Sequence, residues 1–207
     1  ANVDTGQQEV VLYDLLASEA RQTSFIAIAL GQIPVSHWFT LGRTMTIAGG
    51  QKTLVSWSGT MFEYLLPALL FRTYRHTVWD SSYRAVIAQQ KAYAGFRKVP
   101  FGISESGYFA FDYQLNYQYH AFGVPGLGLA RGLDQVLVVA PYATMLALPF
   151  APAPARAALR QSQALGATGQ YGFFEALDFT PRRMPEGSHY QIIQSFMAHH
   201  QAMSLLA

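Results

Sequence analysis

The chain has 207 residues, of which 51% are hydrophobic and only 13% are charged, so intrinsic disorder is excluded and a substantial core can form. Its basic residues are scattered and the net charge is only +2, which gives no support for nucleic-acid binding. The absence of cysteine excludes disulfides, thiolate catalysis and cysteine-built zinc sites.

Apolar residues recur mostly at helical spacing along the chain, and long alternating runs are hard to find. The sequence therefore predicts an all-α fold. The first helix is expected over residues 8–30, where Leu15 and Ile26 lie on one apolar stripe and Gly31 follows the end.

A second helix should follow the SWSG turn at 56–59, because Met61, Leu65 and Leu69 recur at spacings of four. A third helix should open near Asp80, which is a good capping residue. The third and later helices are expected at 80–96, 136–148, 153–165 and 189–206.

Two long uncharged stretches, 22–42 and 135–155, resemble membrane segments at first sight. Pro34 interrupts the first, and Pro141 and Pro149 interrupt the second, so neither keeps the roughly 20 apolar residues that a spanning helix needs. We expect buried helices and no membrane span in this chain. The polar start predicts no signal peptide, and the missing initial methionine suggests a processed or excised piece.

The segments between the expected helices combine aromatic residues with acids, histidines, arginines and glycines. They read HWFTLGR, SWSGTMFEY, VPFGISESGYFAFDYQLNYQYHAFGVPGLGLARG and GQYGFFEALDFTPRRMPEGSHY. A sugar ring offers apolar faces that stack on aromatic rings and hydroxyls that need polar partners, so this mixture is typical of a carbohydrate cleft. The alternative is that these loops only pack over the ends of a helical domain.

Three motifs lack the context that their chemistry needs. The glycines of GLGLARG at 126–132 do not have dinucleotide-site spacing, which favours a tight backbone loop. GISESG at 102–107 lacks the spacing of a serine nucleophile elbow. His199 and His200 are adjacent rather than four apart, so a metal site is not expected, and either histidine could be a buried polar group or a ligand contact.

The candidate catalytic acids are Glu19 and Glu105. Glu19 falls on the apolar stripe of the first expected helix, where it would pair with an arginine such as Arg21 or Arg43, or act as an acid of raised pKa. Glu105 lies in a glycine-flanked loop where neither helix packing nor charge balance requires an acid. Glu63 and Glu175 occupy apolar, aromatic settings and could be substrate binders or hydrogen-bond anchors of the core.

The chain resembles a known family through long strings in a fixed order. They are YDLLASEAR, HWFTLGR, VSWSGTMFEYLLP, PFGISESGY, NYQYHAFGVPGLGLARG, APYATMLAL, YGFFEALDFTP, PEG and MAHHQAMSL. In these strings the chain is similar to the glycoamylase-like domain of cyclic β-1,2-glucan synthases, which is related to endo-β-1,2-glucanases. The resemblance covers nearly all of 1–207 and implies a single domain, part of an (α/α)6 toroid that is incomplete at both ends.

The resemblance implies that Glu19, in LASEAR, is the acid/base and that Glu105, in GISES, is the nucleophile of a double displacement on β-1,2-linked glucan. The product would be a ring when the acceptor hydroxyl belongs to the same glucan, and a shorter linear glucan when it is water. The candidate substrate-binding residues are Trp38, Trp57, Tyr108, Tyr117 and Phe174 for stacking, and Arg21, Glu63, Glu175 and His200 for hydroxyls. No metal or organic cofactor is implied. Phe101 stands where the family more often has Trp, and Ala202 where it usually has Gly.

Two other classes of function stay open, a non-catalytic glucan-binding module and a purely structural helical core. The implied partners are the remaining helices or modules of a larger synthase, with a cytoplasmic location beside the inner membrane. We expect an exposed apolar flank, a Trp57 ring that is partly open, and carboxyl groups of Glu19 and Glu105 about 5 to 5.5 Å apart.

Overall fold

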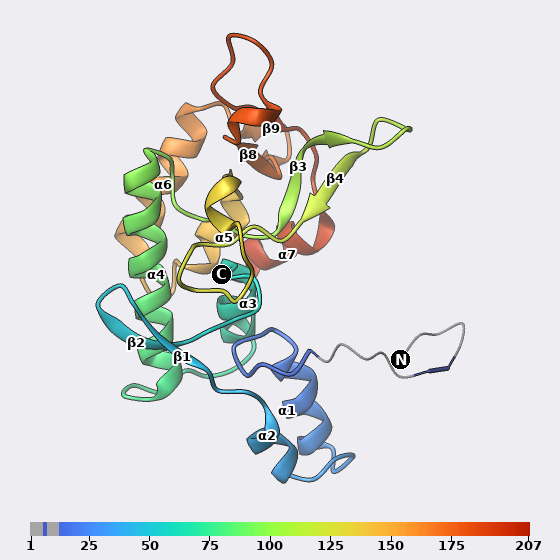
Figure 1. The fold of residues 1–207 in the computed structure, drawn as a ribbon, viewed down its shortest axis with the longest axis vertical. Coiled ribbons are helices and arrows are strands. Elements are labelled where there is room, and N and C mark those ends of the chain that lie inside the picture. Colours follow the sequence, from blue (N-terminus) through green and yellow to red (C-terminus); the bar gives the residue numbers. More distant parts are fainter. Residues whose placement is uncertain (1–5, 8–12) are drawn as a thin grey trace.

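Helices and several small antiparallel sheets share the chain, as the computed structural model of residues 6–7 and 13–207 shows (Figure 1). The all-α prediction is therefore wrong, and the fold is mixed α/β. The strands are two to six residues long, which leaves too few alternating residues for the period of two to stand out from a sequence.

The helices alternate with short strands along the chain. The α-helices are α1 (Arg21–Ala29), α2 (Ser36–Thr40), α3 (Met61–Leu65), α4 (Val78–Arg97), α5 (Pro141–Leu146), α6 (Pro152–Ala164) and α7 (Ala198–Leu206), with 3-10 turns η1 (Leu66–Leu69), η2 (Leu133–Gln135) and η3 (Pro181–Arg183). The strands are β1 (Met45–Ala48), β2 (Gln51–Leu54), β3 (Ser106–Phe111), β4 (Tyr117–His120), β5 (Val138–Val139), β6 (Thr168–Gly169), β7 (Gly172–Phe173), β8 (Ala176–Asp178) and β9 (Gln191–Ile193).

Three predicted helices are confirmed, namely α3, α4 and α6. The α4 helix begins after Thr77, whose hydroxyl accepts from the Asp80 amide, and ends at Lys98, which has a left-handed backbone (φ 57°). On its buried face the Gln90 amide group exchanges two hydrogen bonds with the backbone of Ile103, at 2.8 and 3.0 Å. The longest helix therefore fixes the segment that leads to Glu105.

The other three predicted helices are shorter than expected. The first begins only at Arg21, because Asp14 and Leu16 form backbone hydrogen bonds with Gly42 in an extended segment, and residues 8–12 lie outside the described part of the chain. Its end is confirmed, with Gly31 following at φ 69°. The segments 136–148 and 189–206 each begin with a strand, β5 and β9, and become helical only in α5 and α7.

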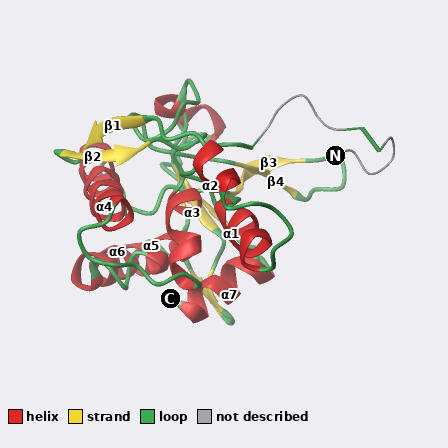
Figure 2. Cartoon of the chain, turned by 90° about the horizontal axis from the view of Figure 1, so that it is seen from below, coloured by secondary structure: helices red, strands yellow, loops and turns green. Residues whose placement is uncertain are grey.

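Four small sheets hold the irregular segments together. Two of them are the hairpins β1–β2 and β3–β4, and the latter projects from the helices in both views (Figures 1 and 2). The three-stranded sheet has the order β5–β8–β9 and is antiparallel. Its central strand β8 is entirely buried, and β3 lies against both β8 and β9. This packing places the start of β3 in the interior.

The SWSG turn packs closely against the glycine-rich loop at 123–128. A Cβ atom on Gly123 would overlap the carbonyl oxygen of Ser58, and one on Gly128 would lie 2.5 Å from the Gly59 nitrogen. Ser56 also donates to and accepts from this loop through its backbone. The expectation of a tight backbone loop in GLGLARG is confirmed, because the glycines permit this close approach.

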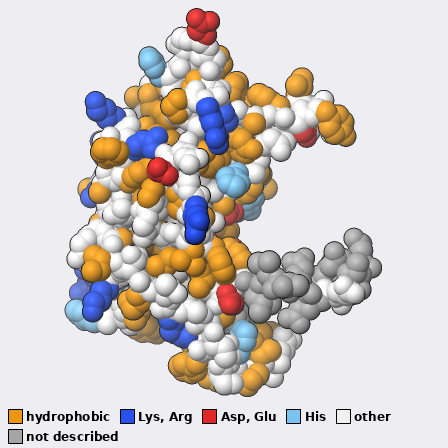
Figure 3. Space-filling view, viewed as in Figure 1, with side chains coloured by type: hydrophobic (Ala, Val, Ile, Leu, Met, Phe, Trp, Pro, Cys, Tyr) orange, Lys and Arg blue, Asp and Glu red, His pale blue; other side chains and the backbone are white. Residues whose placement is uncertain are grey.

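One flank of the molecule leaves apolar side chains exposed. On α1 and α2 and at their adjoining ends, Phe25, Leu30, Val35 and Phe39 are 49 to 72% exposed, and the only buried residue of these two helices is Arg21. Hydrophobic side chains are visible over this part of the surface in Figure 3. The expected apolar flank is thus present. Among the described residues, no helix is long and apolar enough to cross a membrane.

Candidate functional site

Glu105 lies in a bend immediately before β3, with its side chain partly buried. The Tyr119 hydroxyl on β4 donates to its carboxylate oxygen Oε1 at 2.9 Å. The Tyr142 hydroxyl on α5 donates to its backbone carbonyl at 2.9 Å. The loop position expected for this acid is confirmed, and two tyrosines from different elements hold it.

Burial raises the pKa of the Glu105 carboxyl group to about 7, although the hydrogen bond from Tyr119 opposes that rise. The negative charges of Glu19, Glu63 and Glu175 raise the pKa further. A carboxyl group with a pKa near neutral pH can both give and take a proton under physiological conditions. This is the property that a general acid/base needs.

Glu175 and His200 form a buried pair behind Glu105. Both oxygens of the Glu175 carboxylate lie 2.9 Å from Nδ1 of His200, and the two side chains are almost inaccessible to solvent. The Gly107 amide also donates to Glu175, at 3.1 Å. Both side chains are enclosed, so the structure gives no support for the expected contact with a substrate hydroxyl.

Tyr142 connects this pair to the backbone of the loop that carries Glu105. Its ring stacks on the His200 imidazole with centroids 3.6 Å apart and planes 9° apart. Because the Tyr142 hydroxyl donates to Glu105, the neighbouring Ser104 hydroxyl, 2.9 Å away, must donate to Tyr142. Tyr142 thus contacts both the His200 imidazole and the backbone of Glu105, and it helps to hold both in place.

Glu19 lies in a turn just before α1, partly buried, and not on a helical stripe. The expectation of a buried acid on a helix is therefore wrong, because the helix begins two residues later. The Ser18 hydroxyl lies 3.3 Å from its carboxylate. Since the charge of Glu19 raises the pKa of Glu105, the two acids are near enough to interact electrostatically.

Arg21 anchors the turn that carries Glu19. Its guanidinium donates to the carbonyl oxygens of Ser18, Glu63 and Tyr64 and to the Tyr83 hydroxyl, at 2.8 to 3.1 Å. The side chain is 2% exposed. Arg21 therefore supports the fold, and its expected contact with a glucan hydroxyl has no support here.

Glu63 is the acid that organises the SWSG turn. It forms a capping box with Thr60 at the start of α3, and it accepts from the Ser56 hydroxyl and the Ser58 amide at 2.9 and 3.0 Å. Only 1% of its surface is exposed. Of the two roles that the sequence left open, this burial favours a hydrogen-bond anchor of the core.

The aromatic candidates lie in several places. Trp57 is partly buried beside Tyr13, with ring centroids 6.4 Å apart, so the expected partial exposure is confirmed. Tyr117 on β4 is also partly buried. Phe174 is paired with Phe196 at 5.3 Å, whereas Tyr108 is packed edge-on against the core residue Phe122.

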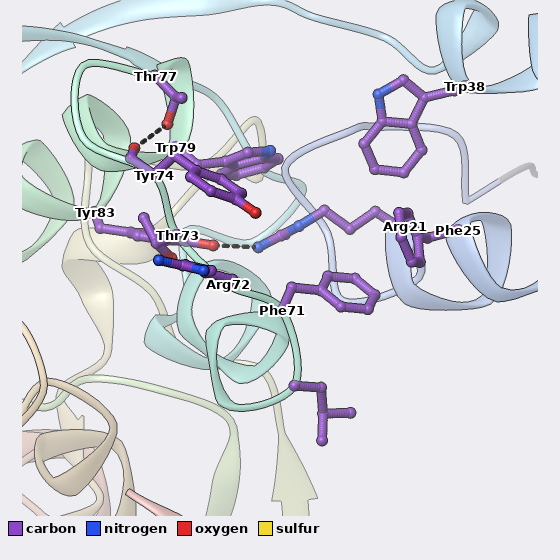
Figure 4. Close-up of a pocket in the computed structure, with 11 residues that line it drawn as sticks. Arg21, Phe25, Trp38, Phe71, Arg72, Thr73, Tyr74, Thr77, Trp79 and Tyr83 are labelled. Carbon is purple, nitrogen blue, oxygen red and sulfur yellow. Dashed lines mark hydrogen bonds between the residues drawn. The ribbon is translucent and has the colours of Figure 1, made fainter. Parts of the chain in front are cut away.

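Trp38 lines a separate cavity of about 410 Å³ between α1, α2 and the start of α4. In Figure 4 its indole faces Arg21 and Trp79 across this space. The lining does not include Glu105 or the residues that hold it. Trp38 is thus not brought to the catalytic candidates.

Sequence reasoning missed Tyr119 and Tyr142. Tyr119 alternates with Tyr117 in YQYH, a period-of-two signal that would have placed both side chains on one face of a strand. Tyr142 follows Pro141 at the start of α5 and gave no signal, because its role depends on tertiary contacts. Within the described residues, no group of three histidines or acids could hold a metal ion.

The sequence is similar to those of known proteins. The Glycoamylase family model matches residues 12–207. The chain is 44% identical over 205 residues to the cyclic β-(1,2)-glucan synthase NdvB of Rhizobium meliloti (strain 1021). This alignment covers 99% of the chain but only 7% of that relative.

Solved structures show the same fold at low sequence identity. An endo-β-1,2-glucanase from Chitinophaga pinensis, in complex with sophorotriose and glucose, has a TM-score of 0.52 and 16% identity, covering 79% of this chain and 39% of that one. A β-1,2-glucanase from Parabacteroides distasonis has a TM-score of 0.50 and 21% identity, covering 91% of this chain and 26% of that one.

Proposed function

The chain belongs to the glycoamylase-like family, and from this premise we propose that it is a glycoside hydrolase-type domain that cleaves and rejoins internal linkages of β-1,2-glucan. The observation that carries the proposal is Glu105, a partly buried carboxyl group with a pKa near 7 that interacts with the charge of a second acid, Glu19. The names of the relative and of the structural neighbours support β-1,2-glucan as the substrate class.

We assign the acid/base role to Glu105 and the nucleophile role to Glu19, which exchanges the roles expected from the resemblance. A general acid must hold its proton near neutral pH, and the raised pKa of Glu105 meets this requirement. A nucleophile must instead be ionised. The partly exposed turn before α1 leaves the Glu19 carboxylate accessible.

In the first step the Glu19 carboxylate attacks the anomeric carbon while the bond to the glycosidic oxygen breaks. The departing oxygen takes the proton of Glu105, which leaves Glu105 ionised. In the second step Glu105 removes a proton from an incoming hydroxyl, which attacks the anomeric carbon and releases Glu19. Such a retaining reaction predicts carboxyl groups about 5 to 5.5 Å apart.

The identity of the incoming hydroxyl decides the product. A hydroxyl from the same glucan closes a ring, and water gives a shorter linear glucan. Stacking on Trp57, Tyr117 and Phe174 would hold the acceptor glucan in place of water, because these partly exposed rings offer apolar faces. Hydrolysis like that of an endo-β-1,2-glucanase is the alternative when this acceptor is absent.

The domain would work together with other parts of a larger protein. The chain spans about 7% of the synthase that it matches, and the exposed apolar residues of α1 and α2 would be covered by further helices. We place this assembly on the cytoplasmic side of the inner membrane, as the family resemblance implies.

Incubation of the protein with linear β-1,2-glucan, followed by mass spectrometry, tests the proposal. New glucans of altered length are expected, and any ring will weigh one water less than the linear glucan of equal length. A folded protein that binds this glucan and leaves it unchanged would instead be a non-catalytic binding module.

A further inference from the structure

Tyr119 occupies a position between two acceptors. Its hydroxyl donates to Glu105 Oε1 at 2.9 Å and lies 3.4 Å from Nε2 of His200. A phenol has a single proton and can donate only one hydrogen bond at a time, whereas its oxygen can also accept. In the present arrangement the shorter contact takes the proton, and the His200 contact is the longer one.

The tautomer of His200 is set by Glu175. Nδ1 faces both oxygens of this buried carboxylate, which can only accept when ionised, so Nδ1 carries a proton. In the neutral imidazole Nε2 is then an acceptor directed at Tyr119. Stacking on Tyr142 fixes the ring plane and prevents the imidazole from turning away.

The direction of these hydrogen bonds depends on the proton of Glu105. An ionised Glu105 accepts from Tyr119. A protonated Glu105 can donate to the Tyr119 oxygen, which frees the phenolic proton to be donated to Nε2 of His200. Within these three side chains, Nε2 of His200 therefore receives the phenolic proton only when Glu105 is protonated, and it has no donor among them when Glu105 is ionised.

We propose that Tyr119 is a positioning residue that reverses its hydrogen bond with Glu105 whenever this carboxyl group gains or loses a proton, with His200 as the second acceptor. This inference rests on the proposed function of Glu105 as acid/base, a residue that must take both protonation states in each reaction cycle. Tyr119 on β4 and Tyr142 on α5 bond to Glu105, and His200 on α7 contacts Tyr119. The charges of Glu19 before α1, Glu63 on α3 and Glu175 before β8 also act on the Glu105 carboxyl group.

The direct test is titration of the Glu105 carboxyl carbon by NMR in the 207-residue chain, with the signal assigned by its loss in Glu105→Gln. Tyr119→Phe removes a donor that stabilises the carboxylate, so the pKa of Glu105 should rise by about one pH unit. The control is Tyr113→Phe, because Tyr113 is 92% exposed in the β3–β4 hairpin and should leave the titration unchanged. An unchanged titration in Tyr119→Phe would overturn the inference.

A double-mutant cycle tests whether His200 is the second acceptor of the Tyr119 proton. His200→Gln should shift the pKa of Glu105 in the presence of Tyr119, and the shift should be much smaller in Tyr119→Phe. Equal shifts in both backgrounds would mean that His200 acts on Glu105 without the phenol, which contradicts the inference. If His200→Gln does not fold, the pKa of Glu105 in Tyr119→Phe alone tests the inference, because Tyr119 is partly exposed and its substitution should leave the fold intact.

The pH profile of kcat/KM for glucan cleavage separates this inference from the proposed function. Tyr119→Phe should move the fall in activity to higher pH, whereas a purely structural role would lower activity at every pH. Absence of glucan cleavage by the native protein would refute the proposed function, and the carboxyl titration would still decide on Tyr119.

Discussion

The guanidinium carbon of Arg21 lies 3.7 Å from the centroid of the Trp79 ring, so that an arginine two residues after Glu19 is enclosed by the start of α4. The same guanidinium donates four hydrogen bonds, three of them to backbone carbonyls. A planar, five-donor group can satisfy this set, and an ammonium group cannot. The position of Glu19 therefore depends on arginine at this site.

Arg21→Lys should lower the free energy of unfolding by about 3 kcal/mol, because buried carbonyl oxygens lose their donors. Glucan cleavage should fall as well, since the turn that carries Glu19 loses its anchor. Urea denaturation measures the first effect. The matched control is Arg160→Lys on the exposed face of α6, which should change stability by less than about 0.5 kcal/mol. Equal effects of the two substitutions would contradict the assignment.

Gly123→Ala should destabilise the protein by about 2 kcal/mol or more, because the new methyl group would overlap the Ser58 carbonyl oxygen and push the SWSG turn away. Gly95→Ala is the control. It lies within α4 with no atom within 4 Å of a new Cβ, so the substitution should stabilise the protein by about 0.5 to 1 kcal/mol. Thermal unfolding of both variants checks the prediction, which fails if Gly123→Ala is tolerated as well as Gly95→Ala.

Part of the fold could be predicted because local signals agreed with tertiary structure. The apolar spacing located α4 and α3, although α4 is capped by Thr77 with Asp80 in its first turn, and not by Asp80 itself. The segment before α1 misled the interpretation because Leu15, Leu16 and Ile26 fit one apolar stripe of a helix, whereas Leu15, Leu16 and Ala17 are in fact buried one after another. Burial there comes from an extended pairing with Gly42, which no local pattern reveals.

The candidate site was predictable only where the chain carried an acid without a structural reason, as at Glu105. The residues that hold Glu105 in place could not be predicted. Tyr119 is 14 residues away in sequence, and His200 bonds to Glu175 across 25 residues. These contacts depend on how β4, α5 and α7 pack together, and a similar residue in the sequence, Tyr108, packs edge-on against the core residue Phe122 instead.

Glu105→Gln should lower the rate of glucan cleavage by about 10² to 10⁴-fold, which is the typical contribution of a general acid/base. The fold should be retained, because the amide has the same shape and can still accept from Tyr119. Glu186→Gln, at an exposed position, is the control and should keep full activity. Normal turnover by Glu105→Gln would remove this residue from the acid/base role.

From the raised pKa of Glu105 we predict how both glucan cleavage and stability depend on pH. Cleavage should fall as pH rises through about 7, because the acid loses its proton. The free energy of unfolding should also fall as pH rises. An unfolded glutamate titrates near 4.3, so between about pH 4.3 and pH 7 the folded protein binds more protons than the unfolded chain. The contribution of Glu105 is fully present below that range and is lost as pH rises through about 7. Melting temperatures of the native protein and of Glu105→Gln at pH 5 and pH 8 test this, and parallel pH curves would contradict it.

The most direct test of the two-acid account is to trap the intermediate on Glu19. A β-sophorosyl fluoride needs no acid to leave, so Glu105→Gln should still form the glycosyl-enzyme, and it should accumulate because the base for the second step is missing. Mass spectrometry of the intact protein and its peptides should find one sophorosyl group, on the peptide that contains Glu19. No adduct, or an adduct on another residue, in a variant whose native form cleaves β-1,2-glucan would contradict the assignment of Glu19 as the nucleophile.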